Sequence, residues 1–482
     1  MSKFLASIRI WGLVVSATVA AAVMAGCAPF GQQPARQAIT PLAQFDPGLA
    51  LRSARGRADV DAHWWRAFGD PQLDRVLADA LADAPSLKAQ RARVDEALAQ
   101  AEVSAAASLP RLGASASALP QRLPRSYNVP PPAAGHWQVN AQALLNASFD
   151  LDVAGRLRAL TRAATLRADQ QQALERAATV SLQAALVETY LQLTLELQLL
   201  EIAQDTLRQQ DYLLRLTRQR AAAGLDMPAA VARAGEPLPL AAAEVERQHA
   251  AVALLRHRLA ALVGRGPGYA DTLTPAPGVL RALAPLPATL PAALVGRRPD
   301  ILAARYRVEA ESAGIDAARA SFYPDINLLA FAGVQSFGFR ALLHGSSGAF
   351  GAGPAITLPI FEGGRLRAGL RAQTDAYNAA VADYDDTVVH ALAQVSDSLV
   401  QLDSLARQRD LTLEALARAQ STYEIETRRY QKGISGYLDV LLAETRLLED
   451  RRSVARADTS LAVEHVRLIA ALGGATNPGA QP

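Results

Sequence analysis

The sequence predicts a mainly helical protein with a smaller β component, built from two copies of one structural repeat. Long coiled-coil helices are expected to form a helical barrel, and amphipathic strands are expected to contribute to a transmembrane β-barrel. Three observations predict this fold class. The positions of Pro and Gly recur along the chain, two very long stretches contain almost none of either residue, and the segment before each of these stretches can form strands.

The positions of proline and glycine recur in the two halves of the chain. Pro85 and Pro299 each begin a helical pattern, and they lie 214 positions apart. The two patterns end at Pro110 and Pro324, which are also 214 positions apart, and a Gly-Arg-Leu-Arg motif follows each copy. A period this long indicates a duplicated domain and not a solenoid of short units.

Two stretches have the composition of very long helices. From Arg156 to Ala223 there is no Gly or Pro, and from Arg365 to Lys432 the only exception is Gly369. Each covers about 68 residues, or roughly 100 Å at a rise of 1.5 Å per residue. Their apolar residues recur at coiled-coil spacing, which is compatible with a barrel of helices or with a plain antiparallel rod. The seam residues are Leu186, Leu193, Leu200, Leu207 and Leu214 in the first stretch and Val381, Tyr384, Val388, Ala391 and Val395 in the second.

Residues 136–150 alternate between apolar and polar side chains, which predicts a strand with two unlike faces. A strand of this length suits a bilayer, where ~9–11 tilted residues are needed. Partner strands are predicted at roughly 111–118, 325–335 and 353–361, with a Gly-rich loop before the last. Soluble hairpins that cap a coiled coil are the alternative. The residues expected to face the membrane are Trp137, Val139, Ala141, Ala143 and Leu145.

Two hairpins supply too few strands to close a barrel. An open strand edge in lipid leaves backbone groups without hydrogen bonds, at a cost of several kcal/mol each. The smallest membrane barrels have about eight strands, and a water-filled lumen needs more. Several chains must therefore contribute. Three chains with four strands each would supply twelve, although this argument does not exclude two or four chains.

The first residues have the pattern of a secretory signal. Lys3 and Arg9 precede a short apolar run from Ile10 to Met24, and a spanning helix would need ~20 apolar residues. Small residues then precede Cys27, as in the bacterial lipobox, where the thiol takes a diacylglycerol. Cys27 is the only cysteine, so no intramolecular disulfide is possible. We expect Cys27 to be lipidated, and an ordinary signal that happens to contain a cysteine is the alternative.

Charge and composition narrow the possible functions. The formal net charge is +3, and Lys3 and Arg9 leave with the signal, so the mature chain is nearly neutral, which argues against nucleic acid as a partner. No later stretch is apolar enough for a transmembrane helix. The seven His have no metal-ligand spacing, and we find no catalytic motif. We therefore predict no enzyme activity and no cofactor apart from the diacylglycerol and N-acyl group on Cys27.

These features predict five segments. They are a signal peptide (1–26), a lipid-anchored N-terminal linker (27–62), a first repeat (63–262), a second repeat (263–472) and a flexible C-terminal tail (473–482). Each repeat begins with a helix and ends with a return helix. In the first repeat a β-hairpin (110–150) and a long helix (155–223) lie between them. In the second repeat a β-hairpin (324–361) and a long helix (364–432) lie between the first helix and the return helix.

Six motifs within about residues 64–472 resemble the TolC-like outer-membrane factors, specifically the efflux lipoprotein channels of NodT/OprM type. The motifs are Trp65–Leu73, Phe149–Arg156, Leu294–Ile301, Phe322–Ile326, Leu358–Arg365 and Tyr437–Leu441. The resemblance implies a homotrimer whose β-barrel is completed by trimerisation, located in the outer membrane and extending into the periplasm. It also implies a periplasmic adaptor and an inner-membrane transporter as partners.

The same resemblance places a gate where the second long helix turns back. Gly433 would form the turn, Tyr430 would take part in a closing network, and Leu438 and Asp439 would form three-fold rings. Apolar rings gate by dewetting, and carboxylate rings favour cations. The alternative is that these side chains only pack and cap a helix turn.

The predicted function is a passive channel of a tripartite efflux pump, which exports drugs or other small molecules from the periplasm. A channel for protein secretion shares this architecture. A periplasmic adaptor or coiled-coil protein without a channel is the third possibility.

Overall fold

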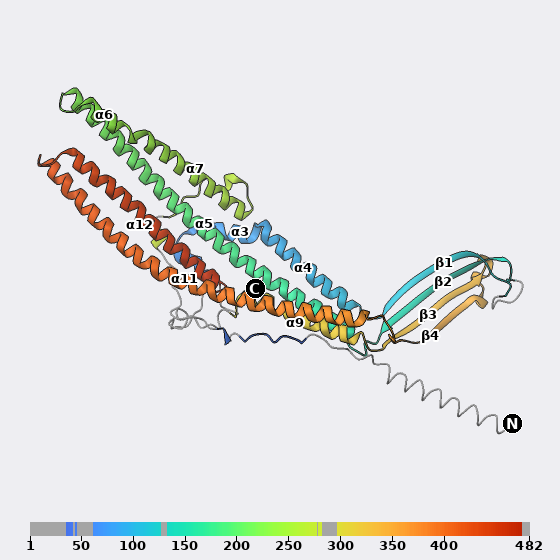
Figure 1. Ribbon diagram of the computed structural model, residues 1–482. Coiled ribbons are helices and arrows are strands. Elements are labelled where there is room, and N and C mark those ends of the chain that lie inside the picture. The colour runs from blue at the N-terminus through green and yellow to red at the C-terminus, as the bar shows by residue number, and fades with distance from the viewer. Residues whose placement is uncertain are drawn as a thin grey trace, which may run out of the picture. The chain divides into compact units, whose positions relative to one another are not determined.

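The computed structural model describes residues 35–41, 44–45, 61–126, 133–276, 278–281 and 296–474 (Figure 1). The predicted signal peptide and Cys27 lie outside these residues. So do most of the predicted N-terminal linker and most of the predicted C-terminal tail.

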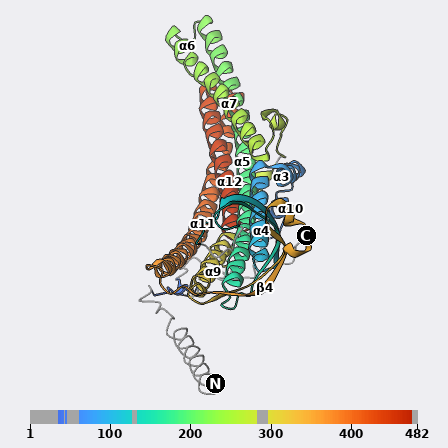
Figure 2. The ribbon, with the colours of Figure 1, turned by 90° about the vertical axis from the view of Figure 1, so that its right-hand side faces the viewer.

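Four strands form one curved antiparallel sheet in the order β1-β2-β3-β4 (Figure 1, Figure 2). Their bounds are Arg111–Arg122 for β1, Trp137–Asp150 for β2, Asp325–Phe337 for β3 and Gly348–Thr357 for β4. Four strands per chain were predicted, and the fold class is confirmed. The central pair, β2 and β3, comes from different repeats. Their register runs from Asn140 opposite Phe337 to Asp150 opposite Asn327.

The position of β4 was wrong in the sequence prediction, which placed this strand at 353–361. The strand starts at Gly348, inside the stretch that was predicted to be a Gly-rich loop. Gly351 lies opposite Phe331, and a Cβ on Gly351 would come within 2.7 Å of that ring. The aromatic ring therefore covers the glycine, as it does in other sheets. The strand ends at Thr357, before Leu358-Pro359.

The helices occupy most of the remaining described chain. They are α3 (Pro71–Asp83), α4 (Pro85–Ala106), α5 (Arg156–Ala222), α6 (Pro228–Gly235), α7 (Pro237–Val263), α9 (Pro299–Ala320), α10 (Phe339–Leu342), α11 (Arg365–Gln431) and α12 (Tyr437–Ala471). Both α5 and α11 have 67 residues, which confirms the prediction of two very long helices. The return in the first repeat is divided at Glu236, before Pro237, whereas α12 is continuous over 35 residues.

The chain forms two compact units, and each combines parts of both repeats. Among the described residues, one contains 35–39, 94–126, 133–171 and 304–384. The other contains 40–41, 44–45, 61–93, 172–276, 278–281, 296–303 and 385–474. The first unit holds the sheet. There Ile315 of α9 and Phe322, just after α9, are buried in one cluster with Leu370 of α11. The duplicated sequence therefore does not fold as two separate domains.

The second unit is a bundle in which α12 contacts both long helices. Arg467 of α12 forms an ion pair with Glu188 of α5, and Asp458 of α12 pairs with Arg409 of α11 at 2.5 Å. The predicted seam is largely buried, since Leu186, Leu193, Val388 and Val395 are all 0% exposed. Coiled-coil spacing thus identified the packed face of each helix.

A buried polar network holds the start of α3 against α5. The Tyr190 hydroxyl, on a side chain that is 0% exposed, donates to Asp70 Oδ2 at 2.7 Å. The Asp70 carboxylate also accepts from the backbone N–H groups of Gln72 and Ala276, both at 2.8 Å. Burial, together with this carboxylate, raises the pKa of Tyr190, so the hydroxyl remains a donor. One side chain of α5 thereby fixes a helix start and a distant loop.

We predict that Tyr190→Phe destabilises the protein by about 1–3 kcal/mol, because the buried Asp70 loses a charge-assisted hydrogen bond. The measurement is the midpoint of thermal unfolding in detergent, followed by circular dichroism. Tyr323→Phe is the control, since this ring is 47% exposed. Equal midpoints for the two variants would contradict the role given to the network.

Candidate functional site

One face of the sheet is almost entirely apolar. Directly opposed residues of antiparallel strands share a face, so the register extends the predicted apolar face of β2 to all four strands. Its only charged residue is Arg122, opposite Trp137 at the end of the strand pair, and its only other polar residue is Ser336. The remaining members are Leu112, Ala114, Ala116, Ala118, Pro120, Val139, Ala141, Ala143, Leu145, Ala147, Phe149, Ile326, Leu328, Ala330, Ala332, Val334, Gly348, Phe350, Ala352, Pro354 and Ile356.

The five membrane-facing candidates on β2 all lie on this face but differ in exposure. Trp137 is 72% exposed and Leu145 is 53% exposed, whereas Val139 and Ala143 are half-buried. Ala141 is covered, at 1% exposed. The opposite face carries most of the amides and hydroxyls of the sheet, and there Asn146 donates to Ser115 at 3.0 Å. The sheet thus presents two chemically different surfaces.

The turn after α11 is built around Gly433. Its φ of 68° is left-handed, a region that costs a residue with a Cβ roughly 1–2 kcal/mol. The N–H groups of Gly433 and Ile434 donate to the carbonyls of Tyr430 and Arg429, both at 2.9 Å, which closes the end of the helix. Gly224 has a φ of 76° at the same point of the first repeat. Both repeats therefore use glycine to reverse the chain.

The structure brings the predicted gate residues together at the start of α12. Leu438 is 60% exposed. Asp439 already has a local role, because its Oδ2 accepts from the Gly436 N–H at 3.2 Å. A carboxylate in the first turn also suits the positive end of the helix dipole. The capping alternative therefore describes part of what Asp439 does.

An aromatic cluster supports the same turn. The Tyr430 and Tyr437 rings meet edge to face, with centroids 5.0 Å apart, and Tyr437 meets Tyr212 of α5 at 5.3 Å. Burial and the neighbouring tyrosines and Glu444 raise the pKa of Tyr437 to about 12. Sequence reasoning singled out Tyr430 but missed the contacts that Tyr437 makes with Tyr430 and Tyr212, because contacts between helices leave no local signal.

The first-repeat turn lies at the same end of the bundle (Figure 1). There Arg220 Nε donates to Asp226 Oδ2 at 2.8 Å and lowers the pKa of that carboxyl. Leu225 and Met227 are 67% and 74% exposed. Exposed apolar side chains at both turns give this end a surface suited to contact with other chains.

A family model described as outer membrane efflux protein matches residues 76–265 and 290–474. This chain belongs to that family. It is 40% identical over 375 residues to the fusaric acid resistance protein FusA of Burkholderia cepacia, a match that covers 77% of this chain and 70% of FusA. It is also 32% identical over 480 residues to outer membrane protein OprJ of Pseudomonas aeruginosa, which covers 96% of each chain.

A solved structure agrees with these sequence matches. The outer membrane protein VceC of Vibrio cholerae superimposes with a TM-score of 0.78 at 32% identity, over 87% of this chain and all of VceC. The protein is an outer-membrane efflux channel, and the predicted function and location are confirmed. Among its described residues, no group of His, Cys, Asp or Glu could hold a metal ion. None of its described helices is long and apolar enough to cross a bilayer.

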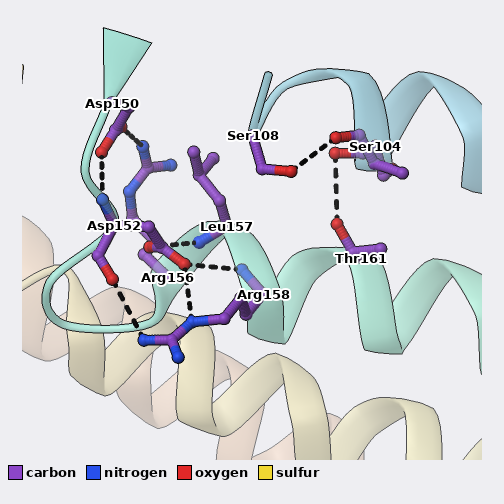
Figure 3. Close-up of polar contacts among 9 residues, drawn as sticks. Ser104, Ser108, Asp150, Asp152, Arg156, Leu157, Arg158 and Thr161 are labelled. Carbon is purple, nitrogen blue, oxygen red and sulfur yellow. Dashed lines mark hydrogen bonds and ion pairs between the residues drawn. The ribbon is translucent and has the colours of Figure 1, made fainter. Parts of the chain in front are cut away.

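In this efflux channel, Asp152 caps the beginning of α5, in the short connection between β2 and that helix (Figure 3). Its φ is 44°, and its carboxylate accepts from the backbone N–H groups of Leu157 and Arg158 at 2.8 and 2.9 Å. These are orphan donors of the first turn of α5, and Gly155 before the helix has no side chain to satisfy them. Burial alone would raise the pKa of Asp152, but bonds from Arg158 and Leu157 outweigh it and lower the pKa.

The same junction is tied to its neighbours. Asp150, the last residue of β2, accepts from the Asp152 N–H at 2.8 Å and pairs with Arg156 (Figure 3). Thr161 of α5 donates to the Ser104 carbonyl of α4 at 3.2 Å. Sequence reasoning noticed the Gly-Arg-Leu-Arg motif here but missed Asp152, whose bonds reach five and six residues ahead.

We predict opposite effects for two glycine substitutions. Gly433→Ala should destabilise the protein by about 1–2 kcal/mol through its left-handed φ alone, since an added Cβ meets nothing within 4 Å. Gly369→Ala, inside α11 and equally unobstructed, should stabilise it by about 0.5–1 kcal/mol. Thermal unfolding midpoints in detergent test both. Shifts in the same direction would show that backbone conformation does not govern the turn.

Proposed function

We propose that three copies of this chain form one channel, in which their sheets close into a single β-barrel. The observation that carries the proposal is the apolar face that runs across all four strands, together with two strand edges that have no partner within the described chain. Edge N–H and C=O groups cannot stay unpaired in hydrocarbon. Pairing β4 of one copy with β1 of the next satisfies them and gives a lumen wider than a side-chain-filled barrel.

The two faces of the sheet fit this assembly. The apolar face, with Trp137 at one end, suits lipid and the bilayer interface. The face that carries Asn146 and Ser115 suits a hydrated lumen. Similarity to VceC over nearly the whole chain supports the same arrangement.

We propose that the turn between α11 and α12 is the resting constriction. Leu438 would form an apolar ring around the three-fold axis, and Asp439 a carboxylate ring beside it. Tyr430 and Gly433 would hold the turn in place, through the ring contact with Tyr437 and the tight helix end.

Conductance in planar bilayers tests this assignment. Leu438→Ser should raise the resting conductance, because a polar ring stays wet. Asp439→Asn should lower the preference for cations while it keeps an acceptor for the Gly436 N–H. Leu411→Ser is the control, since Leu411 is 66% exposed on α11 and about 30 Å of helix away from the turn. Wild-type behaviour of both gate variants would refute the gate.

We further propose that Cys27 carries the lipid anchor. Residues 35–39 belong to the first unit, where the Asn378 amide donates to the Ala35 carbonyl and accepts from the Gln37 N–H, at 3.1 and 3.0 Å. Arg36 lies 5.7 Å from the Tyr377 ring centroid and pairs with Asp316. Asn378 lies 13 residues along α11 from its sheet end, or about 20 Å.

The chain between the anchor and this attachment has enough length. Ala35 lies eight positions after Cys27, and this stretch spans up to about 27 Å when fully extended. That reach covers the distance from Asn378 back to the sheet end of α11. A diacylglycerol and an N-acyl chain on Cys27 could then enter the inner leaflet of the outer membrane.

Mass spectrometry of the mature N-terminus tests the anchor. We expect the wild type to begin at an acylated Cys27 and Cys27→Ser to lack the acyl mass. The Cys27→Ser protein should still fractionate with the outer membrane, since the sheet supplies the insertion. A free thiol at Cys27 in the wild type would refute the proposal.

The channel itself would be passive and would act in a tripartite pump with a periplasmic adaptor and an inner-membrane transporter. FusA is named for resistance to fusaric acid, and OprJ for its place in the outer membrane. By this similarity we propose small organic compounds as the cargo.

A further inference from the structure

A cavity of about 390 Å³ lies between α5, α11 and α12, behind the turn that precedes α12. Its walls include three tyrosine rings, one from each helix: Tyr212, Tyr423 and Tyr437. Leu447 and Leu448 line it as well and are 3% and 5% exposed. A cavity of this volume suits a small molecule with an apolar body.

The rings give the cavity an affinity for positive charge. Tyr212 and Tyr437 meet edge to face at 5.3 Å with an interplanar angle of 63°. The faces of aromatic rings carry negative electrostatic potential, and a cation within about 6 Å of a ring centroid is attracted to it. Tyr212, Tyr423 and Tyr437 line the same cavity from three helices, so a cation inside it would lie near three rings.

A buried acceptor in the wall lacks a donor. Gln209 is 6% exposed, and its Nε2 donates to the Leu441 carbonyl at 3.0 Å. This bond fixes the orientation of the amide, and its Oε1 has no hydrogen-bond partner among the described residues. This oxygen is enclosed, and a ligand N–H group that reaches it after a small local shift would supply the missing hydrogen bond.

The environment of Glu444 disfavours its charged form. Burial and the nearby Asp205 raise the pKa of Glu444, although Arg451 and Gln209 act in the opposite direction. The other arginine in the wall, Arg208, is already bonded to Asp205. A second cation near Glu444 would therefore stabilise its charged form.

We propose that this cavity binds a protonated amine that carries an aromatic or aliphatic group. The ammonium would donate to Glu444 and to Gln209 Oε1, and the apolar body would pack between the tyrosine rings and Leu447. Of the two arginines in the wall, Arg208 is bonded to Asp205 and Arg451 acts on Glu444, so an anion would have to compete with both carboxylates. The ligand would touch α5, α11 and α12 at once and so hold α12 in place.

The proposal does not depend on the channel assignment, because binding is measured without a pore. The probe is 2-phenylethylammonium, and the matched control ligand is 3-phenylpropionate, which has a similar shape and the opposite charge. Saturation-transfer NMR and titration calorimetry on the purified detergent-solubilised protein give the affinity. We expect the amine to bind at millimolar concentration or below and the carboxylate not to bind.

Variants locate the site. Glu444→Gln should weaken amine binding about tenfold through loss of the charge-assisted bond, and Tyr212→Leu should weaken it several-fold. Tyr212 is 47% exposed, so its replacement is the variant that spares the core if Glu444→Gln unfolds. Glu449→Gln is the control, because Glu449 lies on α12 in an exposed pair with Arg446. The control should bind as the wild type does.

Three results would overturn the proposal. They are equal binding of amine and carboxylate, wild-type affinity in both the Glu444→Gln and the Tyr212→Leu protein, and no amine binding at millimolar concentration.

Discussion

Backbone hydrogen bonds that must all be satisfied in hydrocarbon are the constraint on which this molecule depends. A sheet of four strands has two open edges. The free-energy cost of one unpaired N–H or C=O group in lipid exceeds the stabilisation from a typical side-chain contact. The chain cannot meet this demand by itself. The apolar sheet face favours lipid, and the open edges then need hydrogen-bond partners. Further copies of the chain can supply these partners.

Outside the sheet the chemistry is that of a protein in water. There α12 is held to its neighbours by charged and polar contacts, such as Arg467 with Glu188, and by buried leucines and valines of the coiled-coil seam. The helix ends are closed locally, by Gly433 after α11 and by Asp152 before α5. Because glycine and carboxylate caps act over a few residues, each junction is stable without contact to the other.

The candidate gate illustrates how far sequence reasoning reaches. Gly433 was predicted from the helix-breaking residue itself, and its φ of 68° explains why glycine is needed there. The contact between Tyr212 and Tyr437 was missed, since it joins residues 225 positions apart on helices that meet only in the folded chain. Asp439 combines the predicted position at the turn with a helix cap, the role that the sequence had left open as the alternative.

By itself the sequence determined the duplicated repeat, the two long helices and the apolar face of β2, because helix and strand periodicities are local properties of the chain. The sequence misplaced β4. There the Phe331 ring of the neighbouring strand covers Gly351, and the Gly-rich segment is a strand. Only the tertiary structure decided that β2 pairs with β3 across the repeats and that each compact unit draws on both. Strand partners and buried pairs such as Tyr190 with Asp70 depend on which distant segments meet, and no local pattern encodes that choice.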